Sequence, residues 1–173
     1  NSIATAVLKS FNEKFATQPN LYFSPGRINL IGEHIDYNDG YVMPAAINKG
    51  VYYAIAPNKT DIVNFYALDF DESLSIAIDQ IKSIDNWKNY VLSVVNEFLL
   101  AGKPVRGFDC VFGGDIPRGS GMSSSAAVEG GLYFLGWVIL LEQAHVHAFP
   151  HSRVAERQRQ RKRNERMPVE PLR

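Results

Sequence analysis

The stretch SPGRINLIGEHIDYNDGYVMPAAI, residues 24–47, places many polar side chains where the apolar residues around them predict buried elements. Five of these side chains can form ion pairs or strong hydrogen bonds: Arg27, Glu33, His34, Asp36 and Asn38. Glycines at positions 26, 32 and 40 allow the backbone to turn tightly around them. A few polar groups set among apolar residues are typical of a ligand site. So many polar groups beside predicted buried elements require an explanation.

The residues on either side predict a mixed α+β fold. Apolar residues recur at helical spacing near the N-terminus, which predicts a helix over residues 3–15. Residues 20–32, NLYFSPGRINLIG, predict a strand, a Pro-Gly turn and a second short strand. Three further strands, rich in β-branched and aromatic residues, are expected over residues 49–57, 62–69 and 73–78.

The next segment predicts a second helix and another strand. Asp85 can cap a helix within residues 86–102, and Gly102 suits its C-terminal stop. The expected buried face of this helix comprises Trp87, Val91, Val94, Val95 and Phe98. Residues 107–114, GFDCVFGG, predict a strand with Phe108, Cys110 and Phe112 on one face. We expect an α+β domain that has a mostly antiparallel sheet with helices on one side.

A second motif, PRGSGMSSSAA, spans residues 117–127. Gly119 and Gly121 let the backbone bring its N–H groups close to a ligand, and the serines at 123–125 can cap the helix that follows. A helix N-terminus carries about half a positive charge and suits a phosphate group. The motif is not a Walker loop, because no lysine follows the second glycine. The alternative is a solvent-exposed loop that only caps a helix.

The composition limits the class of protein. The formal net charge is zero, so the chain as a whole is not built for a polyanionic partner. The single cysteine, Cys110, excludes a disulfide within the chain and fits a reducing compartment. The most apolar run, residues 131–141, is too short for a bilayer, which needs about 20 residues. We expect a cytoplasmic protein without a membrane partner.

The two motifs together resemble a known family. GRINLIGEHIDYNDGYVMPAAI resembles the galactokinase signature, and PRGSGMSSSAA resembles the second motif of the wider GHMP small-molecule kinases. The resemblance covers roughly residues 1–128, which is the N-terminal part of a longer family protein. It implies the GHMP N-terminal domain, related to the second domain of ribosomal protein S5. It also implies phosphorylation of galactose at its anomeric hydroxyl by ATP and Mg²⁺, in carbohydrate metabolism.

The resemblance assigns roles to residues of both motifs. It implies that Arg27 stabilises charge beside the reacting oxygen, as a fixed guanidinium can during phosphoryl transfer. It implies that galactose is bound by Glu33, His34, Ile35 and Asp36. It implies that the ATP phosphates are bound by Gly119, Ser120, Gly121, Met122, Ser123, Ser124 and Ser125, with Ser125 as a magnesium ligand. Ile35 departs from the family, which usually has threonine there.

Each of these residues also has a structural interpretation. Arg27 could pair with Glu33 or Asp36, and His34 could be a hydrogen-bonded core histidine. Asp36 and Asn38 could be turn residues before Gly40. None of these interpretations accounts for a joint match over more than twenty positions, which favours the binding roles.

The resemblance stops after residue 128. The family continues with a glutamate that helps to hold magnesium and a C-G-x-M-D-Q loop whose aspartate faces the sugar hydroxyl, whereas Asp115 is the last aspartate of this chain. We expect a kinase-like domain over residues 1–143, a disordered basic tail over residues 144–173, and a truncated galactokinase that arose from a frameshift or a misjoined gene. The alternatives are a non-catalytic regulator that binds galactose or ATP, and an inactive fragment.

The tail has chemistry of its own. Residues 151–173 hold eight Lys and Arg against three acidic residues, so RQRQRKRNER could bind nucleic acid or an acidic surface. No aromatic residues are interleaved with these charges, and we expect no specific nucleic-acid partner. His145, His147 and His151 lack a cysteine or carboxylate at ligand spacing, which favours a solvated segment over a metal site.

Overall fold

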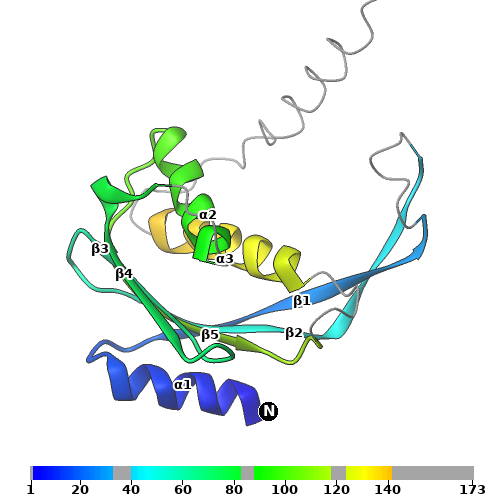
Figure 1. The fold of residues 1–173 in the computed structure, drawn as a ribbon, viewed down its shortest axis with the longest axis horizontal. Helices are drawn as coiled ribbons and strands as arrows, with labels where there is room; N and C mark the ends of the chain where they lie inside the picture. The colour runs from blue at the N-terminus through cyan, green and yellow to red at the C-terminus, as the bar shows by residue number, and fades with distance from the viewer. Residues whose placement is uncertain (1, 33–39, 83–87, 118–123, 142–173) are drawn as a thin grey trace, which may run out of the picture.

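A computed structural model describes residues 2–32, 40–82, 88–117 and 124–141 of the chain. Within these residues lie the elements α1 (Ser2–Lys14), β1 (Asn20–Ile31), β2 (Met43–Pro57), β3 (Ile62–Ala67), β4 (Glu72–Ala77), a short 3₁₀ helix η2 (Ile78–Gln80), α2 (Lys88–Leu100), β5 (Phe108–Gly114) and α3 (Ser124–Leu141). The strands form a five-stranded sheet in the order β1-β2-β5-β3-β4 (Figure 1). The expected α+β fold is confirmed.

The sheet is mostly antiparallel, as predicted. Strands β1 and β2 form one antiparallel hairpin, and β3 and β4 form another. Strand β5 lies between the two hairpins, antiparallel to β2 and parallel to β3. The parallel pair requires a long connection between β3 and β5, and α2 lies within that connection.

Helices cover both faces of the sheet. Helices α2 and α3 lie on one face, and α1 lies on the other (Figure 1). The expectation that the helices share one side therefore holds for α2 and α3 only. Val7 and Phe11 of α1 are fully buried, so the amphipathic pattern of this helix was predicted correctly, but its pattern does not say which face of a sheet it covers.

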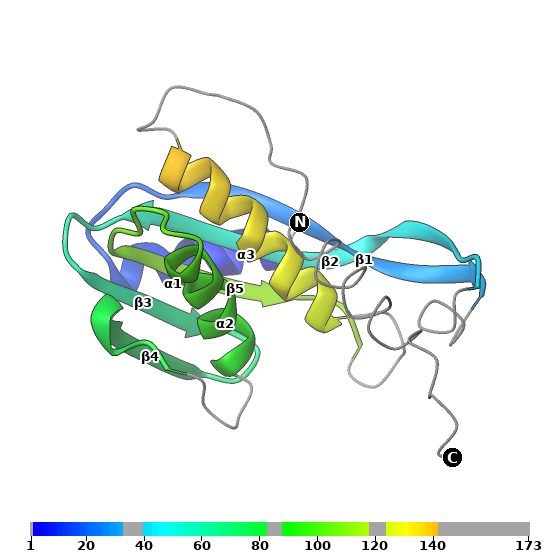
Figure 2. The same cartoon turned by 90° about the horizontal axis from the view of Figure 1, so that it is seen from above.

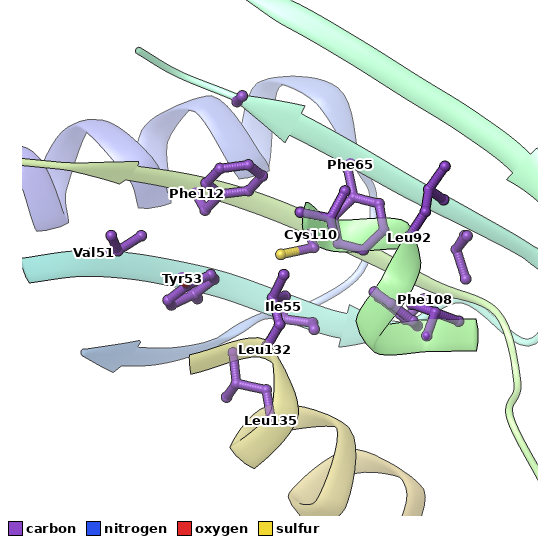
Figure 3. Close-up of a cluster of buried hydrophobic side chains, with 14 of the residues drawn as sticks. Val51, Tyr53, Ile55, Phe65, Leu92, Phe108, Cys110, Phe112, Leu132 and Leu135 are labelled. Carbon is purple, nitrogen blue, oxygen red and sulfur yellow. The ribbon is translucent and has the colours of Figure 1, made fainter. Parts of the chain in front are cut away.

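The larger core lies between the sheet and the pair α2 and α3. The alternation predicted for β5 is confirmed, since Phe108, Cys110 and Phe112 all point into this core (Figure 3). Leu132 and Leu135 of α3 lie against the same core from the helix side (Figure 3). Burial of apolar side chains of this size contributes about 1.5–3 kcal/mol each, which explains why α3 can stay on the sheet.

The predicted turn at Pro25 and Gly26 is wrong. Strand β1 is continuous from Asn20 to Ile31, and its register against β2 shifts between Pro25 and Arg27. Because β1 is an edge strand, a proline there removes no hydrogen bond from a second neighbouring strand. The extra residues at this shift lie on β2, where residues 47–49 are opposite Gly26 alone, so β1 continues through the proline and the glycine.

The predicted end of the second helix is confirmed. Gly102 has a φ of 67°, which an L side chain rarely adopts. Its N–H donates to the carbonyl of Leu99 at 2.9 Å, and the N–H of Lys103 donates to that of Phe98 at 3.0 Å. These two bonds form a Schellman motif. The start of the helix is not tested, because Asp85 and Trp87 lie outside the described residues.

Candidate functional site

Arg27 lies on β1, where its exposed side chain precedes the polar part of the first motif. It pairs in register with Ala46 of β2, immediately after the shift in register. Two residues further along, the amide oxygen of Asn29 is buried and has no hydrogen-bond partner among the described residues. Buried polar atoms nearly always have a partner, so this oxygen is an exception among the described residues.

The segment that carries the remaining sugar-site candidates leaves β1 through a close contact. Gly32 has a φ of 95°, and a Cβ on it would lie 2.5 Å from the carbonyl oxygen of Tyr41. Glycine is therefore required where the two ends of this segment approach each other. Glu33, His34, Ile35 and Asp36 lie outside the described residues, so the structure gives the position of the two ends and not of these side chains.

The segment that carries the second motif starts from a fixed point at the end of β5. The carboxylate of Asp115 accepts a hydrogen bond from the N–H of Gly50 at 2.8 Å, and its own N–H donates to the carbonyl of Gly50 at 3.1 Å. On the other side, the N–H of Gly114 donates to a carboxylate oxygen of Asp69 at 2.9 Å. Strand β2 and the turn that follows β3 thus hold the last residues before the motif.

Gly50 is the link between the two motifs. It pairs with Pro25 of β1, and a Cβ on it would lie 2.2 Å from the carbonyl oxygen of Ser24. Gly50 also exchanges two hydrogen bonds with Asp115. The backbone two residues before Arg27 and the backbone two residues before Pro117 are therefore held on opposite sides of one glycine.

The second motif ends in the first turn of α3, which begins at Ser124. Gly119, Ser120, Gly121, Met122 and Ser123 lie outside the described residues, and the positions of Ser124 and Ser125 are known from the helix backbone alone. The first turn of α3 contains no acidic residue. Its free N–H groups and positive dipole end are therefore not neutralised from within the helix.

The described residues that flank the two motifs lie at one end of the sheet. The N-terminal end of α3, the end of β5 and the region where the β1–β2 hairpin extends beyond β5 lie on the same side of the molecule (Figures 1 and 2). A sugar held beside Arg27 and a phosphate held at the start of α3 would thus approach each other from neighbouring elements. Among the described residues, no group of three His, Cys, Asp or Glu could hold a metal ion.

A buried tyrosine joins α3 to the sheet at this end. The hydroxyl of Tyr53, on β2, donates to the carbonyls of Ala127 at 3.1 Å and Val128 at 3.2 Å. Burial, with a smaller contribution from Cys110, raises the pKa of Tyr53 well above its usual value. The sequence did not single out this residue. The alternating pattern of its strand shows that Tyr53 points to one face, but not that its hydroxyl has a partner on a helix 74 residues away.

Two family models match the chain. The galactokinase galactose-binding signature matches residues 9–57, and the GHMP kinases N terminal domain matches residues 89–136. A galactokinase from Clostridium acetobutylicum is 41% identical over 133 residues, which cover 71% of this chain and 34% of the relative. A galactokinase from Bacillus subtilis is 44% identical over 113 residues, which cover 62% of this chain and 29% of the relative. The chain spans about a third of the length of the curated relatives it matches.

Solved structures show the same fold. The Lactococcus lactis galactokinase complexed with galactose superposes with a TM-score of 0.72 at 35% identity, over 84% of this chain and 38% of that protein. The Methanococcus jannaschii mevalonate kinase superposes with a TM-score of 0.62 at 21% identity, over 77% of this chain and 43% of that protein, and at that identity shows the fold alone. Among the helices that the structure describes, none has the length and apolarity that crossing a membrane requires.

Proposed function

We propose that this chain carries one half of a site at which ATP phosphorylates the anomeric hydroxyl of galactose, because its sequence and fold are similar to the N-terminal part of galactokinases. The observation that carries the proposal is the position of Gly50. This residue holds the strand of Arg27 on one side and the residue that leads into the phosphate motif on the other. In this arrangement, Gly50 would set the distance between a sugar bound beside Arg27 and a nucleotide bound at the second motif.

The sugar would be bound by the segment between β1 and β2. Glu33 and Asp36 supply carboxylates that can each accept two hydroxyl hydrogen bonds, and His34 adds one donor or acceptor. A set of fixed donors and acceptors distinguishes sugars by the direction of each hydroxyl group. Ile35 has no polar side-chain atom, so we infer that it contributes its backbone and an apolar contact.

Arg27 would act on the phosphoryl group that is transferred. Its guanidinium is charged at every physiological pH and presents several donors in a fixed plane. Charge on the equatorial phosphoryl oxygens is stabilised by such a group when it is held in place before the reaction. We therefore infer that Arg27 stabilises the transition state and does not accept a proton.

The nucleotide would be bound by residues 119–125 and the start of α3. The loop supplies backbone N–H groups and serine hydroxyls, and the first turn of α3 adds no negative charge that would repel a phosphate. We propose Ser125 as an oxygen ligand of Mg²⁺, which prefers hard oxygen donors. Mg²⁺ bound with ATP would neutralise charge on the phosphates.

A second proposal is binding without turnover. The match to the GHMP model ends at residue 136, and Asp115 is the last aspartate of the chain. Residues 137–173, beyond that match, contain no aspartate, and a positioned base contributes about 10²–10⁴-fold to rate. The division into a domain over residues 1–143 and a basic tail over residues 144–173 remains a proposal, as does a location in the cytoplasm, which the buried free thiol of Cys110 supports.

Calorimetry and a turnover assay distinguish the two proposals. The purified chain is titrated with galactose, with glucose as an epimer that differs in the direction of one hydroxyl, and with Mg²⁺ and a non-hydrolysable ATP analogue. Galactose-dependent release of ADP is measured in parallel. Binding of galactose and of the analogue together with ADP release supports the kinase, and binding alone supports the regulator. Absence of binding by a chain that unfolds cooperatively would reject both.

A further inference from the structure

We propose that Tyr53 is a positioning residue for the phosphate half of the site, because its hydroxyl fixes where α3 begins relative to the sheet. This inference rests on the proposed function, in which the N-terminal end of α3 binds a phosphate group. It adds a residue that belongs to neither motif and that touches no ligand.

The hydroxyl of Tyr53 reaches the part of α3 that matters for this role. Its two acceptors, the carbonyls of Ala127 and Val128, are three and four residues after the start of the helix at Ser124. A phenol has one proton, so the two contacts share it. The hydrogen bond therefore acts on the first turn of the helix, whose N–H groups would face the phosphate.

Helix α3 also contacts the core by apolar packing, through residues such as Leu132 and Leu135. The helix sequence, SSAAVEGGLYFLGWVILL, contains a single charged residue, Glu129. A helix that is apolar on nearly every side has no polar stripe to fix its rotation, and hydrophobic packing is non-directional. A groove of about 220 Å³ also separates part of α3 from β1 and is bordered by Phe134 of the helix and by Phe23 and Pro25 of the strand.

One close contact, at Gly131, fixes the distance between α3 and the sheet beside Tyr53. A Cβ on Gly131 would lie 2.7 Å from the ring of Tyr53 and 2.8 Å from the Cβ of Ser24. Ser24 lies on β1 three residues before Arg27. Gly131 thus brings α3 close to the strand of Arg27, while the hydroxyl of Tyr53 determines the position of the helix along and about its axis.

Tyr53 is itself held rigidly. Its side chain is fully buried, its strand is paired with β1 at Tyr22 and with β5 at Phe112, and its ring stacks on that of Phe112 with centroids 5.9 Å apart. Burial, followed by the charge of Cys110, raises the pKa of Tyr53. The hydroxyl therefore keeps its proton and remains a donor. A rigid donor can position a helix, whereas an exposed one cannot.

The test is the variant Tyr53→Phe, which keeps the ring and removes only the hydroxyl. The control is Tyr66→Phe, which removes the hydroxyl of a tyrosine on the α1 face, where it donates to Asp71 at 2.6 Å. Three quantities are measured on each chain: the Kd of the non-hydrolysable ATP analogue with Mg²⁺, the Kd of galactose, and the exchange rates of the amide protons of α3.

In Tyr53→Phe we expect the Kd of the ATP analogue to rise about tenfold, as for the loss of one well-placed hydrogen bond. The Kd of galactose should stay within about twofold, and amides in the first turns of α3 should exchange faster. Tyr66→Phe should change none of these quantities. A purely structural role would instead weaken both ligands equally, and that result would overturn the proposal, as would unchanged binding of the analogue.

The failure of the proposed function looks different. If the unchanged chain does not bind the ATP analogue, the phosphate site itself is wrong. Amide exchange then still decides whether Tyr53 positions α3, because unchanged exchange in the first turns of α3 of Tyr53→Phe would overturn that statement without any ligand.

Discussion

Asp115 and Gly50 are joined by two hydrogen bonds that run in opposite directions. The Gly50 N–H donates to the Asp115 carboxylate at 2.8 Å, and the Asp115 N–H donates to the Gly50 carbonyl at 3.1 Å. The other carboxylate oxygen of Asp115 lies 3.8 Å from the ammonium group of Lys49, and both side chains are partly exposed. The side chain of Asp115 therefore extends the pairing of β5 with β2 by one residue beyond the strand.

Asp115→Ala should lower the free energy of unfolding by about 1 kcal/mol, because the buried N–H of Gly50 loses its acceptor. Asp115→Asn keeps an oxygen at the same place and should cost less than about 0.5 kcal/mol. Lys49→Met should likewise have a small effect, since exposed ion pairs contribute about 0–1 kcal/mol. Urea unfolding measures all three variants. Equal stability of Asp115→Ala and the unchanged chain would show that the carboxylate is not needed.

Gly131→Ala and Gly130→Ala should shift stability in opposite directions. A Cβ at Gly131 would lie 2.7 Å from the ring of Tyr53, so overpacking should cost about 1–3 kcal/mol. A Cβ at Gly130 meets nothing within 4 Å, so the higher helix propensity of alanine should add about 1 kcal/mol. Thermal unfolding of the two variants gives both values. If they have the same sign, the close approach of α3 to Tyr53 is wrong.

Arg27→Lys should affect chemistry without affecting stability. Lysine keeps the charge but loses the planar pair of donors, so galactose-dependent ADP release should fall about 10²-fold, as when one positioned donor is removed from an active site. The free energy of unfolding should stay within about 0.5 kcal/mol, because the side chain is exposed.

Arg106→Lys is the control for this variant. Arg106 is also exposed but lies just before β5, at the end of that strand away from Asp115. The variant Arg106→Lys should leave galactose-dependent ADP release unchanged. Identical behaviour of the two variants would count against the assigned role of Arg27.

Stability should fall at alkaline pH because of Cys110. Burial, followed by the charge of Asp109, raises the pKa of this thiol in the folded protein. The unfolded chain releases the proton above about pH 8.5, while the folded chain keeps it, so the contribution of the thiol is complete below that pH and is lost as the pH rises. The expected slope is about −1.4 kcal/mol per pH unit.

Cys110→Ala isolates this effect. Between about pH 9 and 10.5, the free energy of unfolding should fall less steeply in the variant than in the unchanged chain. The difference should be about 1.4 kcal/mol per pH unit. Burial, the larger cause of the raised pKa of Tyr53, acts in both chains, and only the smaller contribution from Cys110 is lost in the variant. Urea unfolding at several pH values measures this difference between the two chains. Parallel curves would mean that the thiol is not buried in solution.

The sequence predicted the elements well and their arrangement less well. Periodicity gave α1, the buried face of β5 and the stop of α2 at Gly102, because local patterns and backbone preferences determine these features. It failed at Pro25 and Gly26, where a turn was expected. A proline followed by a glycine usually marks a turn, but β1 continues through this pair at the edge of the sheet, and the irregularity in pairing is taken up by β2. No local pattern records the position of β1 at the edge.

The residues of the site also divide into those that the sequence predicts and those that it does not. Motif residues such as Arg27 were found from the sequence, because their types and order are distinctive. Asp115 and Tyr53 were not, because each acts on a partner that is distant in the chain: 65 residues for Asp115 and Gly50, and 74 for Tyr53 and Ala127. Long-range hydrogen bonds leave no periodic signal in a single sequence.

The central place of β5 in the sheet has a consequence for how the chain acquires its fold during synthesis. Each of the two hairpins can form from neighbouring residues soon after it leaves the ribosome, but they do not touch in the sheet order β1-β2-β5-β3-β4. They are joined only when residues 108–114 insert between them. Until then, both hairpins expose unpaired edges, which are sites of aggregation. A nascent chain that pauses before residue 108 is therefore at its most vulnerable, whatever the stability of the finished domain.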